Sequence, residues 1–214
     1  SVVIGVTYGA TSGFVGGRTD AVMMRIVDTL MSIPFLVLVI VLQAVLSDWS
    51  TNTSGWIVEN WSWNKGFTDR LTNVVPLFFA LGLFGWLTLA RIVRAQVMSI
   101  KEREFVEAAT ALGLSKGRIL FRHVIPNTLG PTVVYATLTV PGFIMYEATL
   151  SYLGLGVESP NSSWGILIKE GANYLETQVQ LLIIPGLFFS LTLFALNFLG
   201  DGLRDALDPK ASKD

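Results

Sequence analysis

Four long apolar segments constrain the fold of this chain more than any other feature of its sequence. They cover residues 29–46, 74–90, 132–153 and 179–199, and a fifth apolar segment at residues 2–17 is shorter. The hydrocarbon core of a bilayer is about 30 Å thick, so roughly 20 residues of apolar helix are needed to cross it. With 51% hydrophobic and 14% charged residues, the composition is typical of a membrane protein. The sequence predicts an all-α polytopic membrane protein with five spans; a soluble all-α protein with buried helices is the alternative.

The distribution of lysine and arginine predicts which ends of the spans face the cytoplasm. Most of these residues lie at 18–25, 91–122 and 204–213, and few lie in the connecting segments 47–73 and 154–178. Basic residues are enriched on the cytoplasmic side of membrane proteins. We therefore expect a multi-pass protein of the cell (inner or plasma) membrane, with its C-terminus and the segment between the third and fourth spans in the cytoplasm.

Glycines recur every four residues in the first apolar segment, at Gly5, Gly9, Gly13 and Gly17. In a helix this spacing puts them on one face, and such a face lets a neighbouring helix approach closely. The pattern predicts a helix-packing surface, with a glycine-rich loop as the alternative.

The cytoplasmic segment at about 99–127 is predicted to form two short helices. Ser99 and Glu102 fit a capping box for the first helix, and Gly113 is expected to end it. Ser115 is expected to cap the second helix, and Pro126 to limit its extent and return the chain toward the membrane.

The first of these helices carries small residues. Phe105, Ala109 and Leu112 are spaced to share one apolar face, and the alanines keep the surface low beside two acidic residues. Such a helix is suited to docking another protein, but an amphipathic helix at the lipid headgroups is equally consistent with the residues. The residues of this surface are Glu104, Glu107, Ala108, Ala109 and Ala111, and the basic residues suited to lipid are Lys116, Arg118 and Arg122.

The string "EAATALGLSKGRILFRHVIPN" at residues 107–127 resembles the EAA motif of the permeases of ATP-binding-cassette (ABC) importers. The resemblance implies a type I importer transmembrane domain (MetI-like), in which this loop is the coupling helix that fits a cleft of a cytoplasmic ATPase. The positions that match the motif, and hence the expected ATPase-coupling residues, are Glu107, Ala108, Ala109, Gly113, Ile125 and Pro126.

Three further stretches narrow the resemblance. They are "GGRTDAVMMRIVDTLMSIP" at 16–34, "SYLGLGVESPNSSWG" at 151–165 and "GDGLRDALDPK" at 200–210, and they are similar to the C-type permease of dipeptide/oligopeptide importers. The resemblance implies binding-protein-dependent peptide transport with a homologous second permease subunit, two cytoplasmic ABC ATPases and an extracytoplasmic substrate-binding protein. Six spans are typical of the family, so we expect that this chain lacks the front of the protein.

Two alternative functions stay open. Related permeases take nickel chelates or oligosaccharides, so a same-family permease for one of these substrates is the first alternative. A different class is an ATP-independent secondary transporter or channel subunit.

The sequence carries no set of residues for catalysis. It contains no G-x-x-x-x-G-K-[ST] motif, so we expect that this chain binds no cofactor and that ATP and Mg are held by the partner ATPases. His123 is the single histidine and the chain has no cysteine, so no metal site is expected. The net charge of −1 gives no reason to expect nucleic acid as a partner. The chain is predicted not to be an enzyme.

Glu147 is the one acidic residue within an apolar segment. Carboxylates inside membrane spans usually face protein or a water-filled cavity. Glu147 therefore either lines the transport pathway or has a structural role within the bundle.

Overall fold

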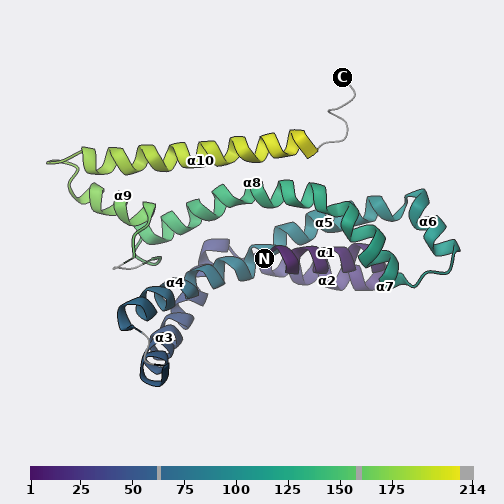
Figure 1. The fold of residues 1–214 in the computed structure, drawn as a ribbon, viewed down its shortest axis with the longest axis horizontal. Coiled ribbons are helices and arrows are strands. Elements are labelled where there is room, and N and C mark those ends of the chain that lie inside the picture. Colours follow the sequence, from purple (N-terminus) through teal and green to yellow (C-terminus); the bar gives the residue numbers. More distant parts are fainter. Residues whose placement is uncertain (62–63, 158–160, 208–214) are drawn as a thin grey trace. The chain divides into compact units, whose positions relative to one another are not determined.

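The computed structural model describes residues 1–61, 64–157 and 161–207, and these residues form helices joined by turns. Figure 1 follows them in chain order. The elements are α1 Val2–Val15, α2 Gly17–Met31, α3 Phe35–Trp61, α4 Lys65–Phe84, α5 Trp86–Lys101, α6 Glu104–Ala111, α7 Lys116–Ile119, a π-helix Leu120–Val124, α8 Ile125–Tyr152, α9 Trp164–Asn173 and α10 Gln180–Leu207.

The helices fall into two compact units. Of the described residues, unit 1 comprises 1–33, 84–138 and 199–207, and unit 2 comprises 34–61, 64–83, 139–157 and 161–198. The predicted coupling segment therefore belongs to unit 1, together with α1, α2 and α5.

Within residues 1–61, 64–157 and 161–207, three helical stretches are long and apolar enough to cross a membrane. They are Lys65–Lys101, Lys116–Tyr152 and Gln180–Ala206, and they contain the predicted spans 74–90, 132–153 and 179–199 almost entirely. α1 is a shorter apolar helix. The expected span 29–46 is not one continuous helix, because the chain bends between α2 and α3, and this bent pair counts as a fourth span only if both halves are taken together.

The break lies at Ser32–Pro34, and its cause is local. Proline disfavours helical backbone at the residue before it, here Ile33. The Ser32 hydroxyl donates a hydrogen bond to the Thr29 carbonyl at 2.7 Å, which satisfies one of the last carbonyls of α2. The sequence alone predicted one span here because its apolar residues continue across the proline.

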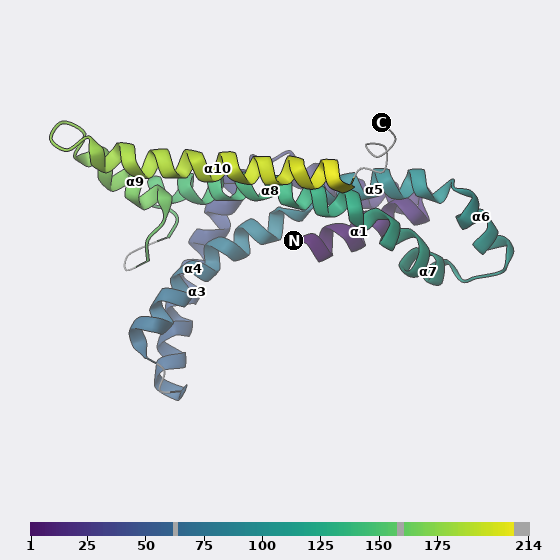
Figure 2. The same cartoon turned by 45° about the horizontal axis from the view of Figure 1, so that its top comes forward.

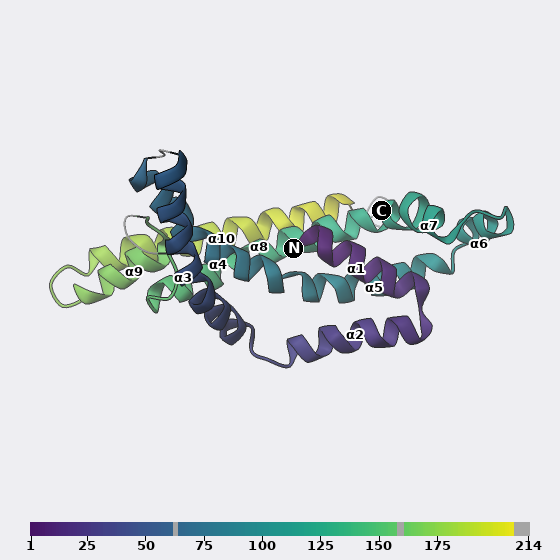
Figure 3. The same ribbon diagram turned by 90° about the horizontal axis from the view of Figure 1, so that it is seen from below.

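The core of unit 1 is built around the contact between α1 and α5, which lie side by side (Figure 3). Gly5, Gly9 and Gly13 face α5, where a Cβ atom would come within 3.0 Å of Leu89, 2.3 Å of the Ala90 carbonyl and 2.8 Å of the Arg94 carbonyl, respectively. The close approach lets the apolar residues of both helices pack together. The buried members of this core are Val6, Ala10, Phe14, Leu89, Val93, Val97, Val106, Ala109, Ile119, Leu120 and Val124.

Gly17 does not belong to this packing face. α1 ends at Val15, and Gly17 begins α2 with φ of +60°. A Cβ at Gly17 would meet nothing within 4 Å. Its role is in the tight turn between α1 and α2, where left-handed backbone favours glycine.

Helix α8 passes through Pro126, which was expected to end the second short helix. The π-helix immediately before it is the reason. In this wider turn the Ile125 amide donates to the Leu120 carbonyl, five residues back. A wider turn gives space to the proline ring, which would clash with a carbonyl in a regular α-helix. Residues 116–152 therefore form one continuous helix.

Candidate functional site

Helix α6 begins later than the sequence predicted. Ser99 lies inside α5, and the N-cap of α6 is Arg103, whose side chain makes no capping hydrogen bond. The capping box of Ser99 and Glu102 is therefore not formed. α5 continues through Ser99 because Val93 and Val97 are buried against α1, and packing of this kind outweighs a local capping preference.

The end of α6 is a Schellman turn at Gly113. The Gly113 amide donates to the Thr110 carbonyl at 3.0 Å, and the Leu114 amide donates to the Ala109 carbonyl at 3.2 Å. Gly113 has φ of +77°, a conformation that glycine adopts without steric cost. Gly113 thus ends the helix as the sequence indicated. From α6 the chain leads into α7 (Figure 2).

One face of α6 is held by the core of unit 1, and the opposite face is open. Val106 and Ala109 are buried, while Glu107 and Ala108 are exposed. The buried pair is spaced by three residues, so both side chains lie on the same side of the helix. α6 is therefore fixed along one side and accessible along the other.

The structure corrects two expectations about this helix. Ala109 contributes to the core and not to the surface, so its methyl group is not available to a partner. Of the apolar face predicted for Phe105, Ala109 and Leu112, Phe105 and Leu112 are 40% and 80% exposed, so Ala109 alone of the three is buried. Leu112 lies beyond the last helical turn, as the C-cap residue, and the helical spacing assumed from the sequence no longer applies to it.

Ile125 and Pro126, the last two motif residues, lie at the start of α8. Ile125 packs against the core of unit 1 as a partly buried residue, and Pro126 is exposed. His123 lies in the π-helix, and its carbonyl accepts a hydrogen bond from Asn127 Nδ2 at 2.6 Å. Among the residues that the structure describes, no group of three or more His, Cys, Asp or Glu residues is arranged to hold a metal ion.

A cavity of about 710 Å³ opens between α6 and the ends of α1 and α5. Its wall includes the buried side chains Val106 and Ile119 and the polar side chains Lys101, Glu107 and Lys116. Lys101 Nζ donates to the Phe14 carbonyl at 2.8 Å, which places a cation at the C-terminal end of α1, where it is favourable. Lys101 thereby joins α1 to the residues that lead into α6.

Polar contacts that the sequence analysis did not anticipate join α2 to α1 and α5. Arg94 donates from Nε and Nη2 to the two carboxylate oxygens of Asp20, each at 2.5 Å, and Ser12 Oγ donates to the same carboxylate at 2.5 Å. The hydrogen bonds from Arg94, more than the one from Ser12, lower the pKa of Asp20 below its usual value. The i, i+8 spacing of Ser12 and Asp20 across a double glycine could have indicated that these two residues meet at a turn. Nothing in the neighbouring sequence indicated that Arg94 is the partner of Asp20.

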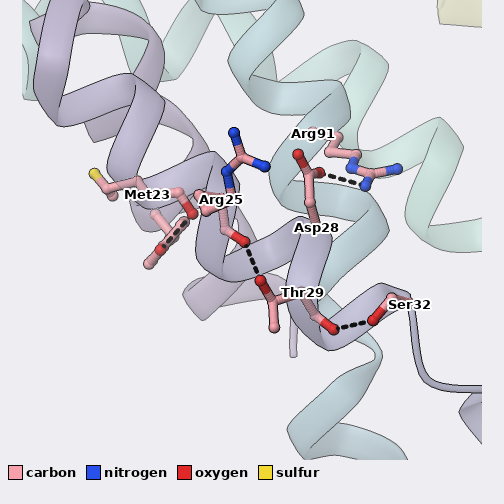
Figure 4. A network of polar contacts seen from close by, with 7 residues as sticks. Met23, Arg25, Asp28, Thr29, Ser32 and Arg91 are labelled. Carbon is pink, nitrogen blue, oxygen red and sulfur yellow. Dashed lines mark hydrogen bonds and ion pairs between the residues drawn. The ribbon is translucent and has the colours of Figure 1, made fainter.

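A second ion pair lies farther along α2 and is shown in Figure 4. Arg91 Nη2 contacts Asp28 Oδ1 at 2.5 Å, with side chains 44% and 54% exposed. On the same helix Thr29 Oγ1 donates to the Arg25 carbonyl at 2.8 Å. Both arginine residues on α5 thus reach an aspartate on α2.

Glu147 lies on α8 within unit 2, and its contacts are local. Ser151 Oγ donates to Glu147 Oε1 at 2.6 Å, and the same hydroxyl accepts from the Val157 amide at 2.9 Å. The chain turns between Ser151 and Val157 at Gly154, which has φ of +80°. This arrangement gives Glu147 a partner that stabilises the end of α8.

The comparison with known families decides what kind of protein this is. Residues 5–213 match the family described as "Binding-protein-dependent transport system inner membrane component". The chain belongs to this family. It is an all-α, multi-pass component of the inner membrane.

Several curated proteins that are similar to this chain are named as peptide permeases. The chain is 47% identical over 210 residues to the oligopeptide transport system permease protein OppC of Haemophilus influenzae. The aligned residues cover 98% of this chain and 60% of that relative. It is 43% identical to OppC of Bacillus subtilis (99% and 62%) and 39% identical to the dipeptide transport system permease protein DppC of that species (97% and 58%). The predicted resemblance to C-type permeases is confirmed. The chain spans about three fifths of the length of these curated relatives.

Proposed function

We propose that this chain is part of the membrane permease of an ATP-driven importer of dipeptides and oligopeptides, in which α6 is the coupling helix. One observation carries the proposal. α6 is fixed to unit 1 through Val106 and Ala109 and ended by the turn at Gly113, yet it leaves Glu107 and Ala108 exposed. A rigid short helix with a low exposed face is suited to contact with another protein, because little order is lost on docking.

The partners follow from the family description and from the names of the relatives. A binding-protein-dependent system needs an extracytoplasmic substrate-binding protein, and this chain has no phosphate-binding loop. Two cytoplasmic ABC ATPases would therefore hold ATP and Mg, and a homologous second permease would complete the pathway. α6 and the C-terminus would face the cytoplasm, in agreement with the clustering of basic residues. The names of the relatives, oligopeptide and dipeptide permeases, favour peptides over nickel chelates or oligosaccharides.

In this mechanism α6 acts as a lever. Closure of the ATPases on ATP would displace α6, and the continuous helices on either side of it would carry the displacement into the membrane. Glu107 would supply a polar contact to the ATPase, Ala108 a surface low enough for close approach, and Gly113 the turn that keeps α6 in place. Ala109 supports this surface from the core.

Substitution of Ala108 by tryptophan tests the proposal. We expect Ala108→Trp to abolish peptide uptake while the permease remains in the membrane, because an indole on the exposed face of α6 blocks close docking of the ATPase. Gly113→Pro is expected to act similarly. Proline cannot adopt the φ of +77° found at this position, and it has no amide hydrogen to donate to the Thr110 carbonyl.

The measurements are ATP-dependent uptake and co-purification of the ATPases. Ala206→Trp is the matched control, because Ala206 is also exposed but lies near the end of α10. Normal uptake in both Ala108→Trp and Gly113→Pro would contradict the proposal.

A further inference from the structure

Helix α2 is held in unit 1 mainly by polar contacts. Val27 is the one residue of α2 that is buried, so the apolar packing of this helix is slight. Its other links include the hydrogen bonds from Tyr8 to the Met23 carbonyl at 2.9 Å and from Ser12 to Asp20 at 2.5 Å. The ion pairs of Asp20 and Asp28 join it to α5. What fixes α2 is therefore a small set of charged and polar groups.

The two ion pairs differ in their surroundings. The Asp20 side chain is 14% exposed and that of Arg94 is 32% exposed, and the carboxylate accepts both guanidinium hydrogen bonds and a third from Ser12. The Asp28 and Arg91 pair is about half exposed and has one contact (Figure 4). A partly buried bidentate pair holds its geometry far better than an exposed single contact.

The position of the Asp20 pair along the chain connects it to the coupling segment. Arg94 lies on α5, two turns before its end at Lys101, and α6 begins three residues later. Lys101 in turn contacts the Phe14 carbonyl of α1. At its other end α2 leads through the break at Ser32–Pro34 into α3.

We propose that the ion pair between Asp20 and Arg94 is the positioning contact that makes α2 follow α5 when the coupling segment moves. The inference rests on the proposed function, because it assumes that α6 is displaced by ATPases. Through this pair the displacement reaches α2 and, along the chain, α3. Asp20 and Arg94 are positioning residues, since neither is required to touch the substrate.

The test compares Asp20→Asn with Asp28→Asn in the reconstituted transporter, with uptake of a dipeptide and hydrolysis of ATP measured together. We expect the number of peptides imported per ATP to fall about tenfold in Asp20→Asn, a size typical of coupling between two sites. In Asp28→Asn the ratio should change less than about twofold, because exposed ion pairs contribute little. The charge-swapped protein, Asp20→Arg with Arg94→Asp, should recover most of the ratio.

A distance measurement reports the motion directly. The chain has no cysteine, so spin labels can be attached at Val22→Cys on α2 and Met98→Cys on α5, two residues that are 61% and 45% exposed. We expect the distance between the labels to stay the same when ATP is added, and to change on ATP addition when Asp20→Asn is also present.

Two results would overturn the inference: an unchanged import ratio in Asp20→Asn, or equal losses in Asp20→Asn and Asp28→Asn. If the Asp20→Asn protein does not assemble, Arg94→Lys is tested in its place, because lysine keeps the charge but loses the paired hydrogen bonds. An unchanged import ratio in Arg94→Lys would also overturn the inference. Uncoupling in Ala108→Trp with normal coupling in Asp20→Asn would reject this inference alone. Normal peptide uptake in both Ala108→Trp and Gly113→Pro would instead reject the proposed function.

Discussion

At the scale of single residues, the contacts of Ser151 distinguish a structural role of Glu147 from a role in transport. Its side chain is 2% exposed, and its hydroxyl lies between the Glu147 carboxylate and the Val157 amide. The contacts favour the structural role of Glu147 over the alternative that it lines the pathway. They also explain the small residue at 156, since a Cβ on Gly156 would come within 2.2 Å of Ser151 Oγ.

We expect Ser151→Ala to destabilise the protein by about 1–3 kcal/mol, because it leaves the Val157 amide without its hydroxyl partner. Glu147→Gln keeps an acceptor oxygen and should change neither thermal stability nor peptide uptake. Thermal unfolding of the purified protein and uptake in vesicles measure the two effects. Reduced uptake in a fully stable Glu147→Gln protein would show that Glu147 belongs to the pathway after all.

At the scale of elements, the contact between α1 and α5 depends on the absence of side chains on one face of α1. The closest point is Gly9, where a Cβ would lie 2.3 Å from the Ala90 carbonyl. A backbone carbonyl cannot rotate away as a side chain can, so any larger residue must separate the helices. The core that holds α6 depends on the same contact, since Val106 and Ala109 pack in it.

We expect Gly9→Ala to lower the stability of the protein by about 1–3 kcal/mol, the usual cost of overpacking. Gly186→Ala in α10 is the matched control, because a Cβ there meets nothing within 4 Å, and alanine favours the helix. The thermal unfolding midpoints of the two variants in detergent give the comparison. Equal midpoints would mean that α1 and α5 do not approach each other so closely in the protein.

At the scale of the whole molecule, the proposed function makes this chain dependent on partners for energy. It contains no G-x-x-x-x-G-K-[ST] motif, and each long apolar helix includes an 18-residue window with at most two charged residues. We expect peptide uptake to stop when the ATPase subunits are removed and to return when they are restored, but not when they are restored in a form unable to hydrolyse ATP. Uptake into membrane vesicles, with and without the ATPases, is the measurement. Continued uptake without them would favour the ATP-independent transporter or channel.

The sequence by itself determined the features that depend on neighbouring residues. Apolar segments of near-span length specified a helical membrane protein, the four-residue spacing of Gly5, Gly9 and Gly13 specified a close helix contact, and Gly113 specified a turn. The resemblance of residues 107–127 and of three further stretches to known permeases indicated the family. These inferences succeed because hydrophobic burial, glycine conformation and helical period act over a few residues.

Only the tertiary structure decided which groups far apart in the sequence meet. Packing against α1 extends α5 past Ser99, and Ala109 is buried in the same core. A π-helix allows the helical segment to continue through Pro126. The pairing of Asp20 with Arg94, 74 residues away, had no local signal. A charged residue gains from whichever opposite charge the fold brings near it, and that choice depends on the packing of three helices at once.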